Sequence, residues 1–274
     1  MDLMNSPQRY ICGTWVLFRV CLVGALFISP FTLEIWTPIW TGPIVGVNWG
    51  MLGDNLPSPS DIRLTHSGIQ RSGALRVKNQ HLAGLAADPA VATAWVATMM
   101  PYIDEVTFDF VVVDNEVIPT DLAHHCRGEP LSLIPPSQGA FSPEAVAAMN
   151  PNTAFVTAND FPRMVNVYPY FGYKSDPEHI PLDHALFRPT SPVVQDGDLS
   201  YHNLFDATLD AVYSALEKVG GSTINIVALE SGWPSAGYGD KTTVATAQEY
   251  NNNLIQHAIS TNGTPKRPGN TIWT

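Results

Sequence analysis

The sequence predicts an α/β domain built around a parallel sheet, and two observations support this fold class. Short apolar runs such as residues 108–113 have the length and composition of strands that are buried on both faces. Longer segments carry apolar residues at every third or fourth position, which is the spacing of an amphipathic helix. Strands that alternate with helices form βα units, so we expect either a doubly wound sheet or a barrel.

The expected elements follow one another along the chain and have clear ends. Asp88 and Pro89 open one helix, because aspartate caps helix N-termini and proline fits the first turn. The two glycines at 220–221 close another helix. Residues 51–80 and 120–140 show no period, and we expect irregular structure there. The expected strands are residues 44–50, 108–113, 164–168 and 224–229, and the other expected helices are residues 141–149, 201–219 and 243–261.

The composition is that of a folded chain with an acidic balance. Hydrophobic residues make up 45% of the 274 residues and charged residues only 14%, which argues against a disordered chain. The formal net charge is −11. Nucleic acids and anionic membrane surfaces both favour Lys and Arg, so the charge argues against either as the main partner. A neutral partner fits this composition better.

The N-terminus has the pattern of a secretory signal peptide. Arg9 precedes an apolar run over residues 11–31, which Arg19 interrupts. The uninterrupted part, residues 20–28, has the length of a signal core and is too short to span a bilayer. We therefore expect residues 1–42 to be a signal peptide and residues 43–274 to be the mature domain, with a membrane anchor as the alternative.

Cysteine use allows no internal disulfide in the expected mature chain. Cys12 and Cys21 fall within the signal segment, so that Cys126 remains alone. His124 and His125 stand directly before it, but three consecutive residues do not easily converge on one metal ion. We therefore expect no metal and no cofactor.

One motif bears on secretion. Asn262-Gly263-Thr264 is the only usable N-glycosylation sequon in the chain.

Two glutamates stand at expected strand ends and are the candidate catalytic residues. Glu116 follows the strand at 108–113, and Glu230 follows the strand at 224–229. In a barrel enzyme the active-site groups collect at the carboxyl ends of the strands, and a pair of carboxylates there can hydrolyse a glycosidic bond. Either glutamate alone could instead be a helix N-terminal charge or part of an ion pair. Aromatic residues at similar places could stack on sugars or only cover the core: Trp49, Tyr168, Tyr170, Phe171 and Trp233.

Several ordered motifs carry a resemblance to a known family. They are residues 46–50 (GVNWG), 53–59 (GDNLPSP), 115–119 (NEVIP), 165–171 (VNVYPYF), 230–235 (ESGWPS) and 263–269 (GTPKRPG). The chain resembles the plant glucan endo-1,3-β-glucosidases of glycoside hydrolase family 17. The resemblance covers residues 44–62, 80–119 and 133–272 and keeps the order of the motifs.

The resemblance implies a (β/α)₈ barrel that hydrolyses the 1,3-β-D-glucosidic linkages of β-1,3-glucan with retention. Glu116 would be the general acid/base and Glu230 the nucleophile, while Asn115 would bond the sugar 2-hydroxyl and Tyr168 would orient Glu230. Together with Tyr170, Phe171 and Trp233, Asn115 and Tyr168 form the expected substrate site. The expected protein is a secreted monomer of the cell wall or apoplast without protein or nucleic-acid partners, and the family allows association with the plasma membrane.

The chain also departs from the family pattern. Strands two, three, five and eight of the barrel are not readable, the last because it would follow Thr274. Asp114 stands where the family has glycine, which adds a second carboxylate near Glu116. We therefore expect an incomplete barrel, and the alternative function is a catalytically inactive, truncated glucan-binding protein of the cell wall.

Overall fold

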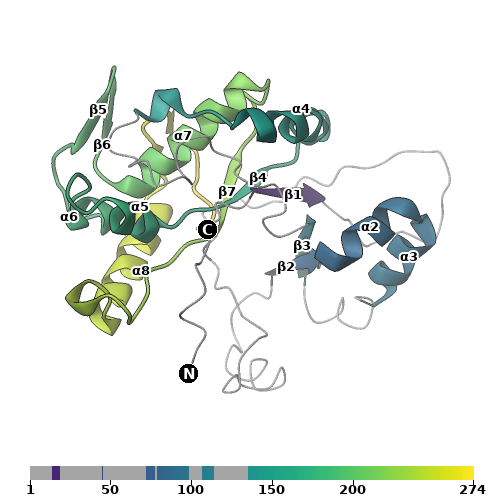
Figure 1. Ribbon diagram of the computed structural model, residues 1–274, viewed down its shortest axis with the longest axis horizontal. Helices are drawn as coiled ribbons and strands as arrows, with labels where there is room; N and C mark the ends of the chain where they lie inside the picture. The colour runs from purple at the N-terminus through teal and green to yellow at the C-terminus, as the bar shows by residue number, and fades with distance from the viewer. Residues whose placement is uncertain (1–13, 19–44, 46–71, 78, 99–106, 114–134) are drawn as a thin grey trace. The chain divides into compact units, whose positions relative to one another are not determined.

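The computed structural model describes residues 14–18, 45, 72–77, 79–98, 107–113 and 135–274 (Figure 1). The chain divides into two compact units. The smaller unit comprises residues 17–32 and 46–114, and the larger unit comprises residues 1–16, 33–45 and 115–274. Each unit is described by itself.

The smaller unit contains a parallel pair of strands. β2 (Ser72–Val77) pairs with β3 (Thr107–Val113), and between them the chain forms helices α2 (Asn79–Ala87) and α3 (Pro89–Ala97). The side chain of Asp88 accepts a hydrogen bond of 2.8 Å from the amide of Ala90, which confirms the expected cap of α3. The expectation of irregular structure over residues 51–80 was wrong for β2. Gly73 and Arg76 interrupt its apolar residues, so no strand pattern shows in the sequence, but pairing with β3 stabilises the strand.

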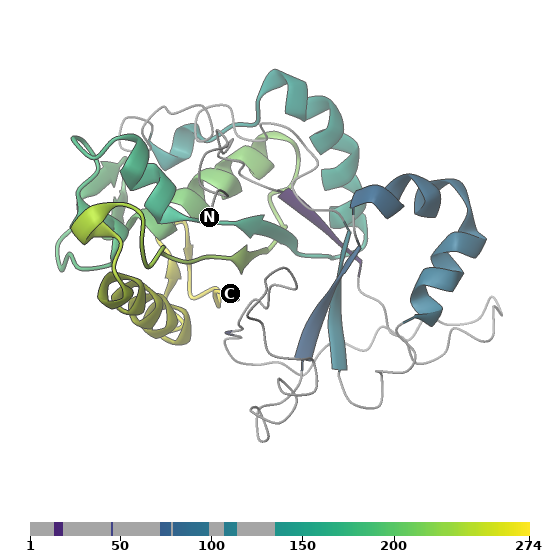
Figure 2. The same ribbon diagram turned by 60° about the horizontal axis from the view of Figure 1, so that its bottom comes forward.

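The sheet of the larger unit is centred on β4 (Arg163–Asn166). This strand pairs in parallel with β7 (Ile226–Glu230) and antiparallel with β1 (Thr14–Phe18). Figure 2 shows β4 and β7 side by side and pointing the same way. All four residues of β4 are buried, as expected of a strand covered on both faces. β1 lies within the residues expected to form a signal peptide, and that expectation stays a prediction.

The helices of the larger unit begin at side-chain caps. Ser142 caps α4 (Pro143–Ala158), Asn203 caps α7 (Leu204–Lys218) and Thr243 caps α8 (Val244–Ile259), each by accepting a bond from the amide three residues further on. The helices expected at 201–219 and 243–261 are thus confirmed with ends that lie one to three residues inside those limits. The helix expected at 141–149 continues to residue 158. The remaining elements are η3 (Pro136–Gln138), α5 (Pro169–Ser175), α6 (Leu182–Ala185), β5 (Val194–Asp196), β6 (Leu199–Tyr201), η4 (Gly239–Lys241), β8 (Gly263–Thr264) and β9 (Arg267–Pro268).

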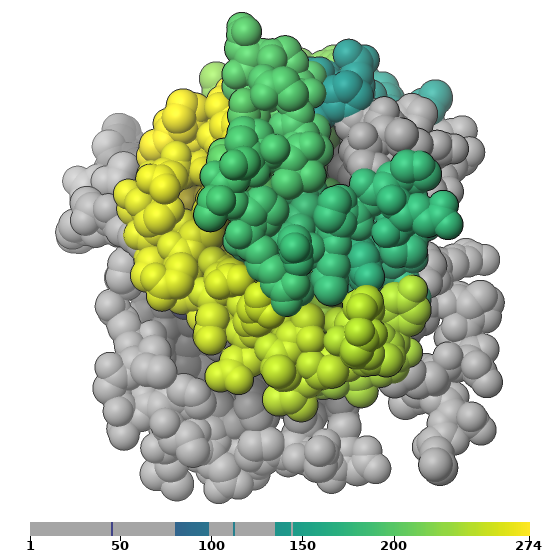
Figure 3. Space-filling view, turned by 90° about the vertical axis from the view of Figure 1, so that its left-hand side faces the viewer, coloured from purple at the N-terminus to yellow at the C-terminus, as the bar shows by residue number. Residues whose placement is uncertain are grey.

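Helix α7 forms the centre of the core of the larger unit. Every residue from Leu204 to Leu216 is buried, so this helix is covered on all sides. The segment after α6 also meets α8: Arg188 bonds Glu249 at 2.7 Å, and Asn253 donates to the carbonyl of Leu186 at 2.8 Å. Figure 3 shows green segments of the larger unit bordering the yellow-green residues of α8.

The last residues of the chain lie beside β7. Trp273 forms a parallel bridge with Val227, and its carbonyl accepts a bond of 2.9 Å from the amide of Ala228. Ile272 is buried next to this bridge. β7 therefore has β4 on one edge and residue 273 on the other. In the described part of the chain, no helix is long and apolar enough to cross a membrane.

Candidate active site

Glu230 lies at the carboxyl end of β7, next to the carboxyl end of β4. The hydroxyl of Tyr168 donates a hydrogen bond of 2.9 Å to Oε2 of Glu230. The backbone carbonyl of Glu230 accepts a bond of 2.8 Å from the amide of Val167. The chain leaving β4 thus contacts both the side chain and the main chain of Glu230. Parallel pairing brings these two strand ends together. The resemblance implied that Tyr168 contacts Glu230, and the roles of both residues in catalysis stay predictions.

The loop that follows Glu230 is attached to α8. The hydroxyls of Ser231 and Tyr250 share a hydrogen bond of 2.5 Å. Tyr250 has no exposed surface, and burial raises the pKa of its hydroxyl well above the ordinary value. The indole of Trp233 donates to the carbonyl of Lys241 at 2.8 Å. Helix α8 and the turn before it therefore hold the loop from the side opposite β4.

The aromatic residues of the expected substrate site differ in how much surface they present. Trp233 and Tyr170 are only 7% and 6% exposed, and their rings meet edge to face at 5.2 Å. Phe171 is 37% exposed and lies 5.6 Å from the ring of the half-buried Tyr168. Of these four residues, Phe171 and Tyr168 present the most surface beside Glu230. Contact with sugar stays a prediction for all four.

The other members of the expected site lie outside the described residues. They are Glu116, Asn115 and Trp49, together with Asp114. The residues His124, His125 and Cys126 also lie outside them. Among the residues that the structure describes, no group of three or more His, Cys, Asp and Glu is placed to hold a metal ion.

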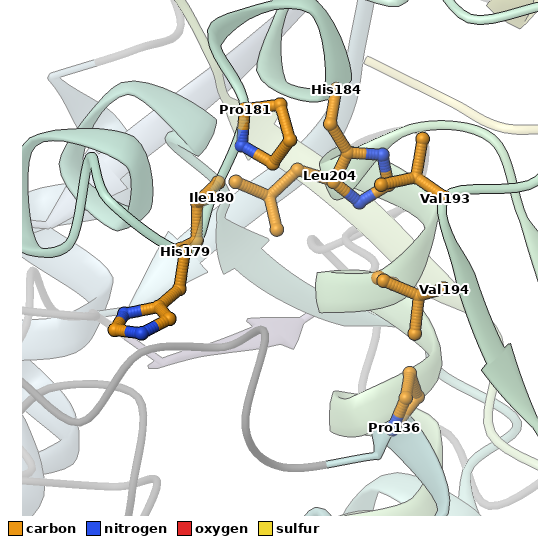
Figure 4. Close-up of a pocket in the computed structure, with 9 residues that line it drawn as sticks. Pro136, His179, Ile180, Pro181, His184, Val193, Val194 and Leu204 are labelled. Atoms are coloured by element: carbon orange, nitrogen blue, oxygen red, sulfur yellow. The ribbon is translucent and has the colours of Figure 1, made fainter.

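A separate cavity of about 310 Å³ shares no residue with the expected site (Figure 4). His184 lines it and is almost fully buried; its Nδ1 lies 3.2 Å from the carbonyl of His202. Burial lowers the pKa of His184, which favours the neutral imidazole, and no described residue bonds its Nε2. The cavity is otherwise mainly apolar, with His179, Pro136, Ile180, Pro181, Val193, Val194, Leu204 and Ala207 around it.

Sequence reasoning missed two contacts of this region. It singled out Glu230 and Tyr168, but it did not include Ser231 or Tyr250 in the site. Ser231 falls inside the 230–235 motif and could have been found there. Tyr250 lies 19 residues further on, inside an amphipathic helix, where a buried tyrosine looks like any other core residue.

Comparisons with known proteins agree on one family. Residues 129–274 match the model of glycosyl hydrolases family 17. A probable glucan endo-1,3-beta-glucosidase of Arabidopsis thaliana is 38% identical over 276 aligned residues, which cover 83% of this chain and 80% of that protein. A putative glucan endo-1,3-beta-glucosidase of Hordeum vulgare is 36% identical, and the alignment covers 84% of this chain and 86% of that protein.

Solved structures give the same result. A beta-1,3-glucanase and pollen allergen of Cryptomeria japonica matches with a TM-score of 0.75 and 35% identity, over 85% of this chain and 88% of that one. A chain from the structures of two plant beta-glucan endohydrolases with distinct substrate specificities matches with a TM-score of 0.73 and 32% identity. The match covers 84% of this chain and 89% of that one. The motifs, the matched residues and these likenesses lead to one conclusion: the chain belongs to family 17 of the glycosyl hydrolases.

Proposed function

We propose that this protein is a retaining endo-hydrolase of 1,3-β-D-glucosidic linkages in β-1,3-glucan. The names of its relatives, glucan endo-1,3-beta-glucosidases of several plants, support the substrate and the bond. One structural observation carries the proposal. Glu230 ends β7 beside the end of a parallel strand, half-buried, with a tyrosine hydroxyl on its carboxylate.

The proposed reaction uses two carboxyl groups in two steps. Glu230 attacks the anomeric carbon while Glu116 protonates the leaving glycosidic oxygen, which gives a covalent glycosyl-enzyme. Glu116 then takes a proton from water, and the water displaces Glu230. Both steps invert the anomeric centre, so the product retains the configuration of the substrate. The retaining mechanism requires the carboxyl groups of Glu116 and Glu230 to lie about 5–5.5 Å apart.

Other residues bind and orient in this scheme. Tyr168 fixes the direction of the Glu230 carboxylate through its 2.9 Å bond. Asn115 bonds the sugar 2-hydroxyl beside the cleaved linkage. The exposed ring of Phe171 is the apolar surface on which a sugar face lies, and the buried ring of Tyr170, itself packed on Trp233, supports Phe171.

The proposal extends to fold and location. The parallel strands β4 and β7, each followed by a helix, are consistent with consecutive βα units of a (β/α)₈ barrel. The apolar run at residues 20–28 behind Arg9 supports export through a signal peptide. The protein then acts as a monomer on glucan in the cell wall.

Hydrolysis of laminarin by the purified secreted chain tests the function. We expect new reducing ends, and we expect the Glu230→Gln variant to lose turnover while it still binds glucan, because only the nucleophile is removed. Glu116→Gln should lower kcat by about 10²–10⁴-fold. A matched control is Glu249→Gln, which removes a partly exposed carboxylate in an ion pair with Arg188 and should leave activity intact.

Two outcomes would contradict the proposal. Turnover that survives Glu230→Gln would show that another group is the nucleophile. Glucan binding by the wild-type chain with no release of reducing ends would favour the glucan-binding wall protein instead. The anomer formed first, measured by NMR, separates retention from inversion.

A further inference from the structure

The loop that follows the proposed nucleophile is bonded to α8 through one buried hydroxyl. We infer that Tyr250 is a positioning residue for Glu230 that acts through Ser231, and this inference rests on the proposed function. The hydroxyl of Tyr250 bonds the residue next to the nucleophile at 2.5 Å.

The tyrosine itself has a fixed position. Its side chain is fully buried, and its ring lies 5.7 Å from the rings of both Phe187 and Trp233. A close-packed ring of this kind has little room to move. A buried hydroxyl without a partner is costly, so the bond to Ser231 is kept in the folded state. Tyr250 therefore supplies a rigid anchor for a half-buried loop residue.

Glu230 is held from two sides by this arrangement. From β4, the amide of Val167 and the hydroxyl of Tyr168 bond the main chain and the carboxylate of Glu230. From α8, Tyr250 holds Ser231, the next residue. The bond from Tyr250 fixes the position of Ser231, and through the main chain it limits the positions open to Glu230. A shift of about 1 Å in a reacting group can cost a factor of 100 in rate.

A second buried tyrosine offers a matched control at the other end of the same strand. The hydroxyl of Tyr213, on α7, accepts a bond of 3.2 Å from the amide of Ile226, the first residue of β7. Tyr213 is also buried, at 6% exposure. Phenylalanine at either position removes one buried hydroxyl bonded to β7 or to the residue after it. Of these two tyrosines, Tyr250 is the one bonded next to Glu230, and Tyr213 is bonded at the opposite end of β7.

The experiment compares kcat and KM on laminarin for four variants of the full chain. We expect Tyr250→Phe and Ser231→Ala each to lower kcat roughly 10- to 100-fold with little change in KM, because orientation affects the chemical step. The double variant should lose no more than either single one, because both remove the same bond. Tyr213→Phe should lower the unfolding temperature to a similar extent and keep the wild-type kcat.

The outcomes separate this inference from the proposed function. If the wild type hydrolyses laminarin and Tyr250→Phe keeps the kcat of Tyr213→Phe, the positioning role is wrong and the function stands. If the wild type releases no reducing ends, the function fails and the role fails with it. Should Tyr250→Phe not fold, Ser231→Ala removes the same bond from a half-buried residue, and an unchanged kcat in that variant overturns the role.

Discussion

Asp210 lies on α7, and its carboxyl group is completely buried in the core. It accepts a hydrogen bond from Thr264 Oγ1 and another of 2.8 Å from the amide of Lys266. These bonds tie the middle of α7 to the β8–β9 hairpin. Burial nevertheless dominates and raises the pKa of Asp210 from 3.8 to about 6, while the two bonds oppose the rise. The residue therefore makes the stability of the fold depend on pH.

The direction of this dependence follows from the pKa of Asp210 in the two states. The folded chain binds the proton more tightly than the unfolded chain, so the contribution of Asp210 is fully present below pH about 4. It falls as the pH rises to about 6, by up to roughly 3 kcal/mol. Urea unfolding at pH 4.5 and pH 7 measures it. We expect the stability of Asp210→Asn relative to wild type to increase over this interval, and parallel profiles would contradict the prediction.

At the residue scale, sequence reasoning found a contact between residues that both stand in family motifs, and it missed a contact between residues that no pattern linked. Tyr168 and Glu230 stand in two family motifs, and the structure places the tyrosine hydroxyl on the carboxylate. The bond between Asp210 and Thr264 joins residues 54 positions apart. Nothing in the local pattern of either residue marks it, because a buried polar contact depends on how helices and hairpins pack.

At the level of elements, the long periodic helices and the apolar strands β3, β4 and β7 were predictable, and the strands of two or three residues were not. α7 and α8 have capping residues and regular apolar spacing, and both were found within three residues of their ends. The strands of the β5–β6 and β8–β9 hairpins have only two or three residues, too few to show alternation. α4 runs on through Pro151 although proline cannot donate a helical bond, and Thr153 and Val156 beyond it are buried.

One connection between elements depends on a glycine. η3 lies against α7 so closely that a Cβ on Gly139 would come within 2.1 Å of the backbone oxygen of Ala211. Lys218, at the end of α7, donates to the carbonyls of Gly139 at 2.8 Å and Gln138 at 3.0 Å. A side chain at residue 139 would push η3 away and weaken these bonds.

We expect Gly139→Ala to destabilise the fold by roughly 1–3 kcal/mol, the cost of overpacking. Thermal unfolding should show it, at about 2–4 °C for each kcal/mol in a chain of this size. Gln138→Ala is the control, because residue 138 is exposed and keeps its backbone carbonyl. Equal unfolding temperatures for the two variants would mean that η3 can move without cost.

For the whole molecule, the hydrophobic pattern of the sequence predicted only that the chain contains parallel βα units. Helix period and buried strands indicate a layered α/β fold, but they do not separate a barrel from a doubly wound sheet, since both use the same local units. The family came from ordered motifs, which encode a shared ancestry that composition cannot reveal. The described strands β1, β4 and β7 of the larger unit form an open sheet, and the barrel remains the proposal for the complete fold.

The bond between Thr264 and Asp210 also has a consequence for the timing of modification. Thr264 is the third residue of the Asn262-Gly263-Thr264 sequon, and its side chain is 4% exposed. Asn262 itself is exposed. Glycosylation of asparagine requires the threonine hydroxyl of the sequon. In the folded chain this hydroxyl donates a hydrogen bond to Asp210. Folding and sugar attachment therefore compete for one hydroxyl.

In a secreting host, we expect the fraction of chains glycosylated at Asn262 to depend on how fast the hairpin closes. Asp210→Ala removes the acceptor that withdraws Thr264, so its occupancy, read by mass spectrometry before and after glycosidase treatment, should exceed that of wild type. Asn262→Gln should show no glycan and keep the buried bond. Equal occupancy with and without Asp210 would mean that attachment is complete before the competition begins. If the occupancies differ, the presence of a glycan at Asn262 depends on how long the β8–β9 hairpin stays open before it folds.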